Sequence, residues 1–187
     1  MFKNIVSSLF ALVAAPGKAW QSISSKEESQ ATFLNGYLYP IMGITALSVF
    51  VNLLNDQFTL EKALKLMTID FVKFFVGFYI ASFLIDELLQ KFFDREKNPK
   101  QVQLFVGYTL SVYMLITIFL NLFMGMFSFL RFAPLYIIYI IWEGSKYYMD
   151  INENKRLMFV VLSSLILIFS PDIIERFMFI LMPGLGN

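Results

Sequence analysis

The feature that most limits how this chain can fold is a run of thirty residues without a charged side chain, from Gln101 to Leu130. A second uncharged run extends from Ser29 to Asn55. A helix needs about 20 apolar residues to cross a bilayer, so each run is long enough for one span. Hydrophobic residues make up 58% of the 187-residue chain and charged residues 16%, against about 45–50% and 25% in soluble domains. The sequence therefore predicts an all-α, polytopic membrane helix bundle.

We expect one transmembrane domain over residues 1–187, with about five spans after an N-terminal amphipathic helix. The expected segments are a cytoplasmic entry segment at 1–31 and spans at about 32–54, 69–90, 103–125, 129–148 and 157–181. The second is the weakest span, because charged residues lie near both of its ends. Pro171 either kinks the fifth span or divides it into a short span and an interfacial helix, and we favour the single kinked span.

The distribution of basic residues predicts the orientation, because Lys and Arg concentrate in cytoplasmic loops. With five spans, the N-terminal segment and the second and fourth connectors share one side. That side holds Lys3, Lys18, Lys26, Lys91, Arg95, Lys97, Lys100, Lys146, Lys155 and Arg156. The other holds Lys62, Lys65, Arg131 and Arg176, with Lys73 near it. We therefore expect a multi-pass protein of the inner (plasma) membrane, with a cytoplasmic N-terminus and an external C-terminus.

The first fifteen residues repeat apolar side chains at helical spacing. These are Phe2, Ile5, Val6, Leu9, Leu12 and Val13. The pattern predicts an amphipathic helix in the membrane interface. Two alternatives are packing of its apolar face against the protein's own helices, and a signal peptide ending at Ala14 and Ala15. Pro16 directly after that point is unfavourable for cleavage.

Two short elements carry a family resemblance. Pro16, Trp20 and Ile23 follow the short apolar helix, and Gly107 and Tyr108 begin the third span. Together they resemble bacterial members of the Yip (Ypt/Rab-interacting protein) domain family, which are small five-span membrane proteins. Relatives are associated with membrane trafficking and GTPase recruitment, but the Asp-Leu-Tyr-Gly-Pro element of eukaryotic members is absent here. The resemblance thus implies a five-span membrane fold, but it implies no defined activity.

Five polar residues in or near the spans are candidates for function: Asp70, Lys73, Asn121, Glu143 and Asp172. Asp70 and Lys73 share a helix face at i, i+3, which fits an interfacial ion pair or, alternatively, a proton or ion relay. Glu143 is expected to pair with Lys146 or a connector. Asn121 is expected to bond to a neighbouring helix or to line a cavity. Asp172, beside Pro171, could cap a broken helix and meet a cation.

The absence of Cys and His removes disulfides, thiolate and imidazole metal ligands, and the commonest nucleophiles and bases. The net charge of +1 gives no reason to expect a nucleic-acid partner. We expect no cofactor, no metal and no enzymatic activity; the expected partners are the lipid bilayer and either another membrane protein or a second copy. The preferred function is non-catalytic, in membrane organisation or partner recruitment. The alternative is a small permease or channel subunit that uses intramembrane Asp and Glu residues.

Overall fold

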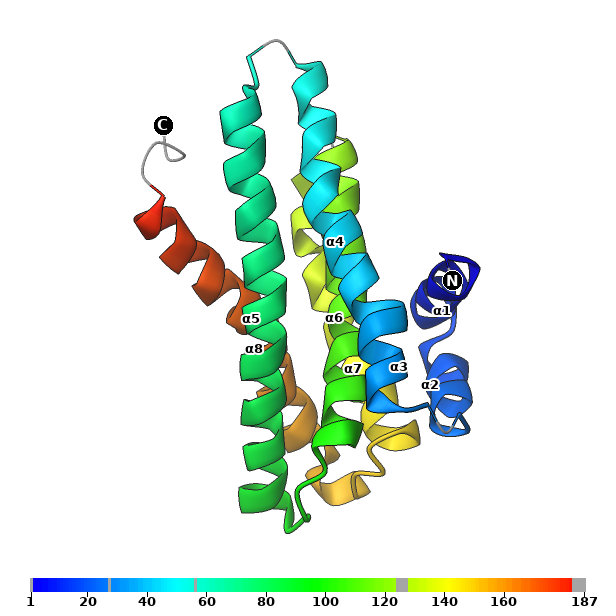
Figure 1. The fold of residues 1–187 in the computed structure, drawn as a ribbon. Helices are drawn as coiled ribbons and strands as arrows, with labels where there is room; N and C mark the ends of the chain where they lie inside the picture. The colour runs from blue at the N-terminus through cyan, green and yellow to red at the C-terminus, as the bar shows by residue number, and fades with distance from the viewer. Residues whose placement is uncertain (1, 27, 56, 124–127, 183–187) are drawn as a thin grey trace.

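Long antiparallel helices form a bundle, and two short helices lie beside it (Figure 1). The computed structural model describes residues 2–26, 28–55, 57–123 and 128–182, and over these ranges it contains helices and no strand. The predicted all-α bundle is confirmed. Four helical stretches are long and apolar enough to cross a membrane: Gln30–Leu54, Leu60–Phe93, Pro99–Leu122 and Glu153–Leu181.

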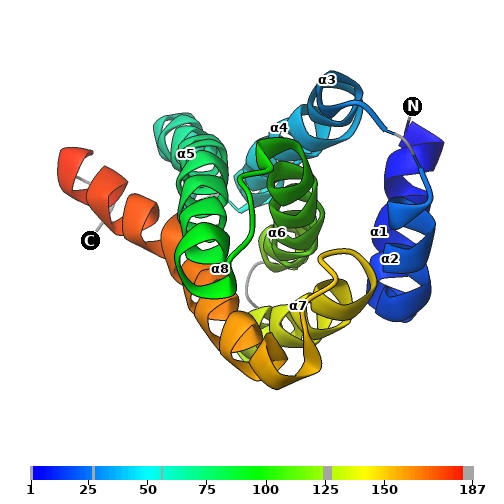
Figure 2. The same ribbon diagram turned by 90° about the horizontal axis from the view of Figure 1, so that it is seen from below.

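The two short helices at the N-terminus are α1 (Phe2–Ala14) and α2 (Pro16–Ser24). Both run crosswise to the long helices, as the two perpendicular views show (Figures 1 and 2). Pro16 separates them because proline lacks the N–H that a continuing helix needs, while its fixed φ suits the first position of a new helix.

The first long stretch changes its helical form along its length. It consists of α3 (Gln30–Phe33), the π-turn η1 (Leu34–Leu38), α4 (Tyr39–Ser48) and the 3₁₀ segment η2 (Val49–Leu54). The Ser29 side chain caps its start by accepting from the Thr32 N–H at 3.1 Å. The π-turn lies just before Pro40, whose ring would clash with the carbonyl of Gly36 in a regular α-helix.

The next two helices, α5 (Leu60–Phe93) and α6 (Pro99–Leu122), begin earlier than the expected spans at 69 and 103. The reason is local capping. The Thr59 hydroxyl accepts from the Lys62 N–H at 3.2 Å, and the Asn98 side chain accepts from the Gln101 N–H at 3.1 Å. The expected end of the third span, Gly125, lies outside the described residues.

The chain then returns through a 3₁₀ segment, η3 (Ser128–Leu135), and α7 (Tyr136–Tyr147). Pro134 lies inside η3, which helps to explain why one long α-helix does not form here. With a rise of about 2.0 Å per residue in the 3₁₀ part and 1.5 Å in α7, the two together reach about 34 Å. That length can cross a hydrocarbon core of about 30 Å, and a fifth span at 129–148 stays a prediction.

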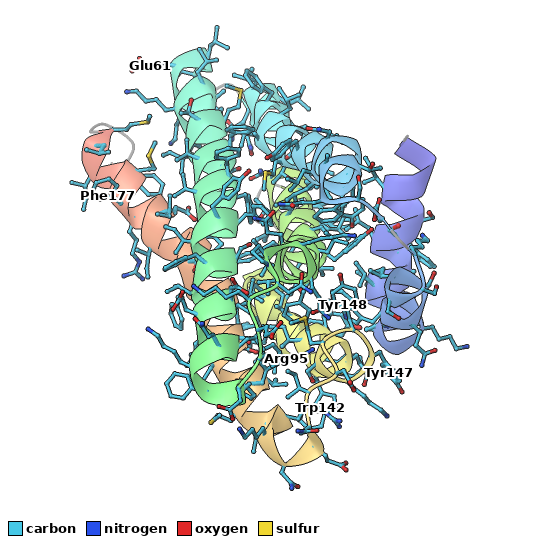
Figure 3. The ribbon with its side chains drawn as sticks, turned by 60° about the horizontal axis from the view of Figure 1, so that its bottom comes forward. Glu61, Arg95, Trp142, Tyr147, Tyr148 and Phe177 are labelled. Atoms are coloured by element: carbon cyan, nitrogen blue, oxygen red, sulfur yellow. The ribbon has the colours of Figure 1, made fainter. Side chains whose placement is uncertain are left out.

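The last helix, α8 (Glu153–Leu181), continues through Pro171 without a break, so the alternative of a span divided at that proline is wrong. It packs on α5 at Gly77, where an added Cβ would lie 3.3 Å from the Pro171 backbone. Beyond this point α8 diverges from the bundle (Figures 1 and 2). Phe177 lies on this diverging part and projects outward (Figure 3), and it is 56% exposed.

The two ends of the bundle differ in the number of Lys and Arg side chains that they carry. At one end the α5–α6 connector meets the α7–α8 turn, because Arg95 donates to the Met149 carbonyl and Gln101 donates to the Tyr148 carbonyl at 2.9 Å. We call this the basic end, since it gathers Lys91, Arg95, Lys97, Lys100, Lys146 and Lys155. The other, where η2 turns into α5, we call the hairpin end; Figure 3 shows Glu61 there and Arg95 at the basic end.

Candidate functional site

A cluster of polar side chains joins four helices near the hairpin end. Lys73 lies 2.7 Å from Asp70 and 3.2 Å from Glu175 on α8. Asn121 on α6 donates to the Ser48 hydroxyl at 2.9 Å and to Asp70 at 3.3 Å. The Lys73 and Asp70 side chains are only 9% and 11% exposed, so each charge depends on its partners. The predicted Asp70–Lys73 ion pair is confirmed, and Asn121 bonds across to neighbouring helices as expected.

A second polar layer lies at the basic end. The Gln30 amide donates to the Gln103 amide oxygen at 2.5 Å, and Asp86 accepts from the Asn98 N–H at 3.2 Å. Beyond it, Glu87 bonds to Lys97 and raises the pKa of that lysine, chiefly through the hydrogen bond. This layer therefore marks where the bundle becomes polar.

The separation of the two layers fits the thickness of a bilayer. Eighteen residues separate Gln103 from Asn121 along α6, and eighteen separate Gln30 from Ser48, which corresponds to about 27 Å of helix. The hydrocarbon core of a bilayer is about 30 Å thick. No Asp, Glu, Lys or Arg lies between the layers on α5, from Phe74 to Ile85, or on α6. The charged cluster and the second polar layer are therefore separated by about the thickness of a hydrocarbon core.

A third group of residues fixes α2 to the bundle. Trp20 is fully buried, and its indole N–H donates to the Ile140 carbonyl on α7 at 3.0 Å. Its ring centre lies 5.4 Å from that of Phe105 and 5.3 Å from that of Tyr148. A Cβ on Gly144 would lie 2.8 Å from both the Phe105 and the Trp20 ring. Only a glycine at this position lets α2 and α6 approach α7 so closely.

The Gly107–Tyr108 pair meets the same group from α6. A Cβ at Gly107 would lie 2.6 Å from the Phe33 ring. The Tyr108 hydroxyl donates to Glu28 at 2.8 Å, and its ring lies edge-on to Trp20 at 6.2 Å. Pro16, Ile23 and Tyr108 are all buried. Trp20 and Tyr108, which come from two separate elements of the sequence, therefore meet in one cluster of aromatic rings. We call this cluster the aromatic seam; it consists of Trp20, Phe33, Phe105, Tyr108 and Tyr148.

Comparison with known families agrees with this arrangement. The Yip1 domain profile matches residues 10–171.

The chain belongs to the Yip1 domain family.

The matched Yip1 domain begins within α1 and ends at Pro171, where α8 crosses α5. It contains the whole aromatic seam and most of the polar cluster, while Asp172 and Glu175 lie just beyond it. A search of curated proteins returned no match. A search of solved structures returned none either.

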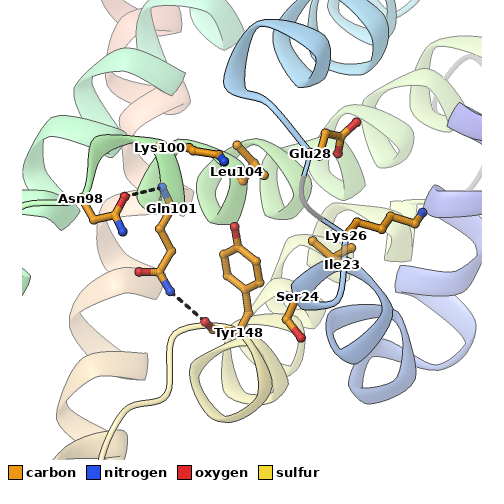
Figure 4. A pocket seen from close by; sticks show the side chains of 9 residues that line it. All are labelled: Ile23, Ser24, Lys26, Glu28, Asn98, Lys100, Gln101, Leu104 and Tyr148. Atoms are coloured by element: carbon orange, nitrogen blue, oxygen red, sulfur yellow. Dashed lines mark hydrogen bonds between the residues drawn. The ribbon is translucent and has the colours of Figure 1, made fainter.

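Beside the aromatic seam of the Yip1 domain, a cavity of about 300 Å³ opens at the basic end (Figure 4). Lys26 and Lys100 line it together with the Tyr148 ring, which stands between α2 and α6 (Figure 4). Within the described ranges, no group of three or more acidic side chains is arranged to hold a metal ion.

Two of the sequence candidates lie elsewhere than expected. Glu143 makes no ion pair with Lys146, whose ammonium lies over the Tyr147 ring at 4.7 Å instead. The Glu143 carboxylate faces Gly17 at the start of α2. Asp172 caps no broken helix, because α8 is continuous, and accepts from the Tyr113 hydroxyl at 2.8 Å. Glu175 was missed as a partner of Lys73, because only the crossing of α5 and α8 brings together residues so far apart in sequence.

Proposed function

We propose that this Yip1 domain protein is a non-catalytic integral membrane protein that organises the bilayer by placing α1 and α2 in one leaflet. The observation that carries the proposal is the two-faced surface of α1. Ile5, Leu9 and Leu12 are buried against the protein, at most 7% exposed. Val6 and Phe10 on another face are 64% and 72% exposed. A helix that packs on protein with one apolar face and exposes another is suited to lie in lipid.

The depth of α1 and α2 follows from the polar layers. The α2–α3 connector carries Glu28, which bonds to Tyr108 only five residues beyond Gln103 on α6. The pair of helices therefore lies near the basic-end layer and crosswise to the spans. If the basic end is cytoplasmic, as the positive-inside rule favours, α1 and α2 occupy the inner leaflet. Helices inserted in one leaflet enlarge it relative to the other, which favours membrane curvature.

The observations give less support to a transport role. A relay or ion path should have polar groups distributed between the two boundaries, whereas Asp70, Lys73, Asn121 and Glu175 bond to one another at a single level. Glu143 faces the start of α2 and not this cluster, and Asp172 accepts a hydrogen bond from Tyr113. A partner-recruiting role for the family motifs would need an exposed surface, but Trp20, Ile23 and Tyr108 are buried.

The test is the shape of reconstituted vesicles. The full chain, inserted at high protein density, is expected to reduce vesicle diameter or form tubules in electron micrographs. The double substitution Val6→Ser/Phe10→Ser should restore the diameter of protein-free vesicles, because it removes the exposed apolar face. The matched control, Leu47→Ser/Leu165→Ser, changes side chains that are 59% and 49% exposed on the long helices and should behave as wild type. Vesicles of unchanged diameter with the wild-type chain would reject the proposal.

A further inference from the structure

A cavity of about 400 Å³ lies between the α1–α2 elbow and the outer face of α7. Ala14, Ala15 and Pro16 form its wall on the elbow side. The polar and aromatic side chains that line it are Lys18, Gln21, Tyr136, Tyr139, Glu143 and Tyr147. The two helices that border the cavity, α1 and α7, also expose apolar side chains, such as Val13 and Ile138.

Glu143 gives the cavity a negative charge without a protein counter-ion. Its side chain is half-buried, and its carboxylate contacts the Cα region of Gly17, where a Cβ would lie only 2.6 Å from Oε2. In the described part of the chain no ion pair or hydrogen bond of this carboxylate is found. The carboxylate faces the start of α2, and the N-terminus of a helix favours a negative charge beside it. No cation of the described residues pairs with this half-buried carboxylate, so it is open to a cation from outside the protein.

Tyrosine rings extend the same surface. Tyr139, Glu143 and Tyr147 recur every four residues and share one face of α7. Aromatic faces attract cations, and aromatic cages recognise ligand ammonium groups. A Cβ at Gly17 would also meet the Tyr147 ring at 3.1 Å, so the glycine keeps the carboxylate and the ring together. The Lys146 ammonium already lies over the Tyr147 ring at 4.7 Å, so Tyr139 and Glu143 are the groups of this stripe that attract a ligand cation.

The opposite wall, from α2, has the opposite charge. Lys18 is exposed and has no acidic partner in the described residues, and Gln21 lies one turn further along α2. Lys18 also belongs to the first turn of α2, where the helix dipole adds to its positive charge. One wall therefore attracts an anion and the facing wall attracts an ammonium, which is the charge distribution of a zwitterionic phospholipid headgroup.

We propose that this cavity binds the headgroup of an aminophospholipid, with its primary ammonium at Glu143 and the tyrosine stripe and its phosphate at Lys18. The acyl chains then extend along Val13 and Tyr136 into the bilayer. The inference shares with the proposed function the placement of α1 and α2 in one leaflet. Its test is independent, because binding is measured in detergent, where no vesicle can change shape.

The experiment is native mass spectrometry of the full chain in detergent, titrated with phosphatidylethanolamine or with phosphatidylglycerol of the same acyl chains. The wild type is expected to bind phosphatidylethanolamine about tenfold more tightly, which corresponds to about 1.4 kcal/mol. Glu143→Gln should remove this preference, and Tyr139→Leu should reduce it. Glu153→Gln, at an exposed acid with no ion pair in the described residues, is the matched control and should keep it. Melting temperature in detergent verifies that each variant is folded.

Equal affinity of the wild type for the two lipids would overturn the proposal, and so would a folded Glu143→Gln variant that keeps the preference. Soluble phosphoethanolamine carries the same charged groups without acyl chains, and it is expected not to displace the lipid at equal concentration. Displacement would identify a soluble ligand and reject the lipid.

Discussion

Replacing Trp20 by alanine tests how α2 is held to the bundle. The side chain is completely buried, and its ring contacts aromatic residues from α6 and from the end of α7. Truncation of a buried Trp to Ala costs about 3–5 kcal/mol in protein cores. The lost indole hydrogen bond to Ile140, 3.0 Å long, accounts for about 0.5–1.5 kcal/mol of this. Trp20→Phe keeps most of the ring contact and is expected to cost about 1–2 kcal/mol.

The loss should fall on the docking of α2 and not on the long helices. The contacts among α4, α5, α6 and α8 do not include Trp20, so these helices keep their own packing. A loss of about 3 kcal/mol increases the undocked population by about two orders of magnitude. Amide hydrogen exchange in α2 should accelerate by a similar factor in Trp20→Ala, while exchange in α5 stays unchanged. Trypsin should also cut more readily at Lys18 and Lys26.

The matched control is Trp142→Ala, which removes the chain's other tryptophan, 40% exposed on α7. It should leave exchange in α2 at the wild-type rate. The reasoning would be refuted if Trp20→Ala left α2 protected, or if both alanine variants released α2 equally.

Two further substitutions, each with a matched control, probe a close helix contact and the buried ion pair. Gly144→Ala places a Cβ 2.8 Å from two aromatic rings and should destabilise the protein by about 1–3 kcal/mol. The control Gly43→Ala, in open space on α4, should be neutral or stabilising by up to about 1 kcal/mol. Thermal unfolding in detergent compares the two variants. Lys73→Met leaves Asp70 as an uncompensated charge and should cost about 3–5 kcal/mol. Lys65→Met, from the more exposed Glu61–Lys65 pair, should cost less than about 1 kcal/mol. Equal losses in the two lysine variants would contradict the burial argument.

The four long apolar helices were predictable because their signal is local. Apolar runs and helix caps lie within a few residues of the elements they define, and even the early start of α5 is encoded by Thr59 and Lys62. The pairing of Asp70 with Lys73 was predictable for the same reason, since i, i+3 neighbours share a helix face. The family elements also followed from short stretches of sequence.

Contacts that depend on how helices cross were not predictable. Trp20 bonds to a carbonyl 120 residues away, and nothing near Gly144 indicates that a tryptophan will cover it. Glu143 was expected to pair with Lys146 or a connector, but the elbow at Pro16 brings the start of α2 against it. The polar layers were hard to predict for the same reason. Gln30, Ser48 and Gln103 are ordinary polar residues in the sequence, and their pairing becomes clear only when the helices place them opposite their partners.

The aromatic seam connects the proposed membrane role with the proposed lipid site, since both depend on where α2 lies. The Trp20 ring holds α2 against α7, and that contact positions Gly17 and Lys18 opposite Glu143 and Tyr147. Undocking α2 should therefore abolish lipid preference and vesicle remodelling together. Glu143→Gln leaves the seam intact and removes only the cation partner, so it should abolish lipid preference while vesicles are still remodelled. The substitution at the seam thus tests whether both effects require a docked α2. The substitution in the cavity tests whether lipid preference can be lost while vesicle remodelling remains.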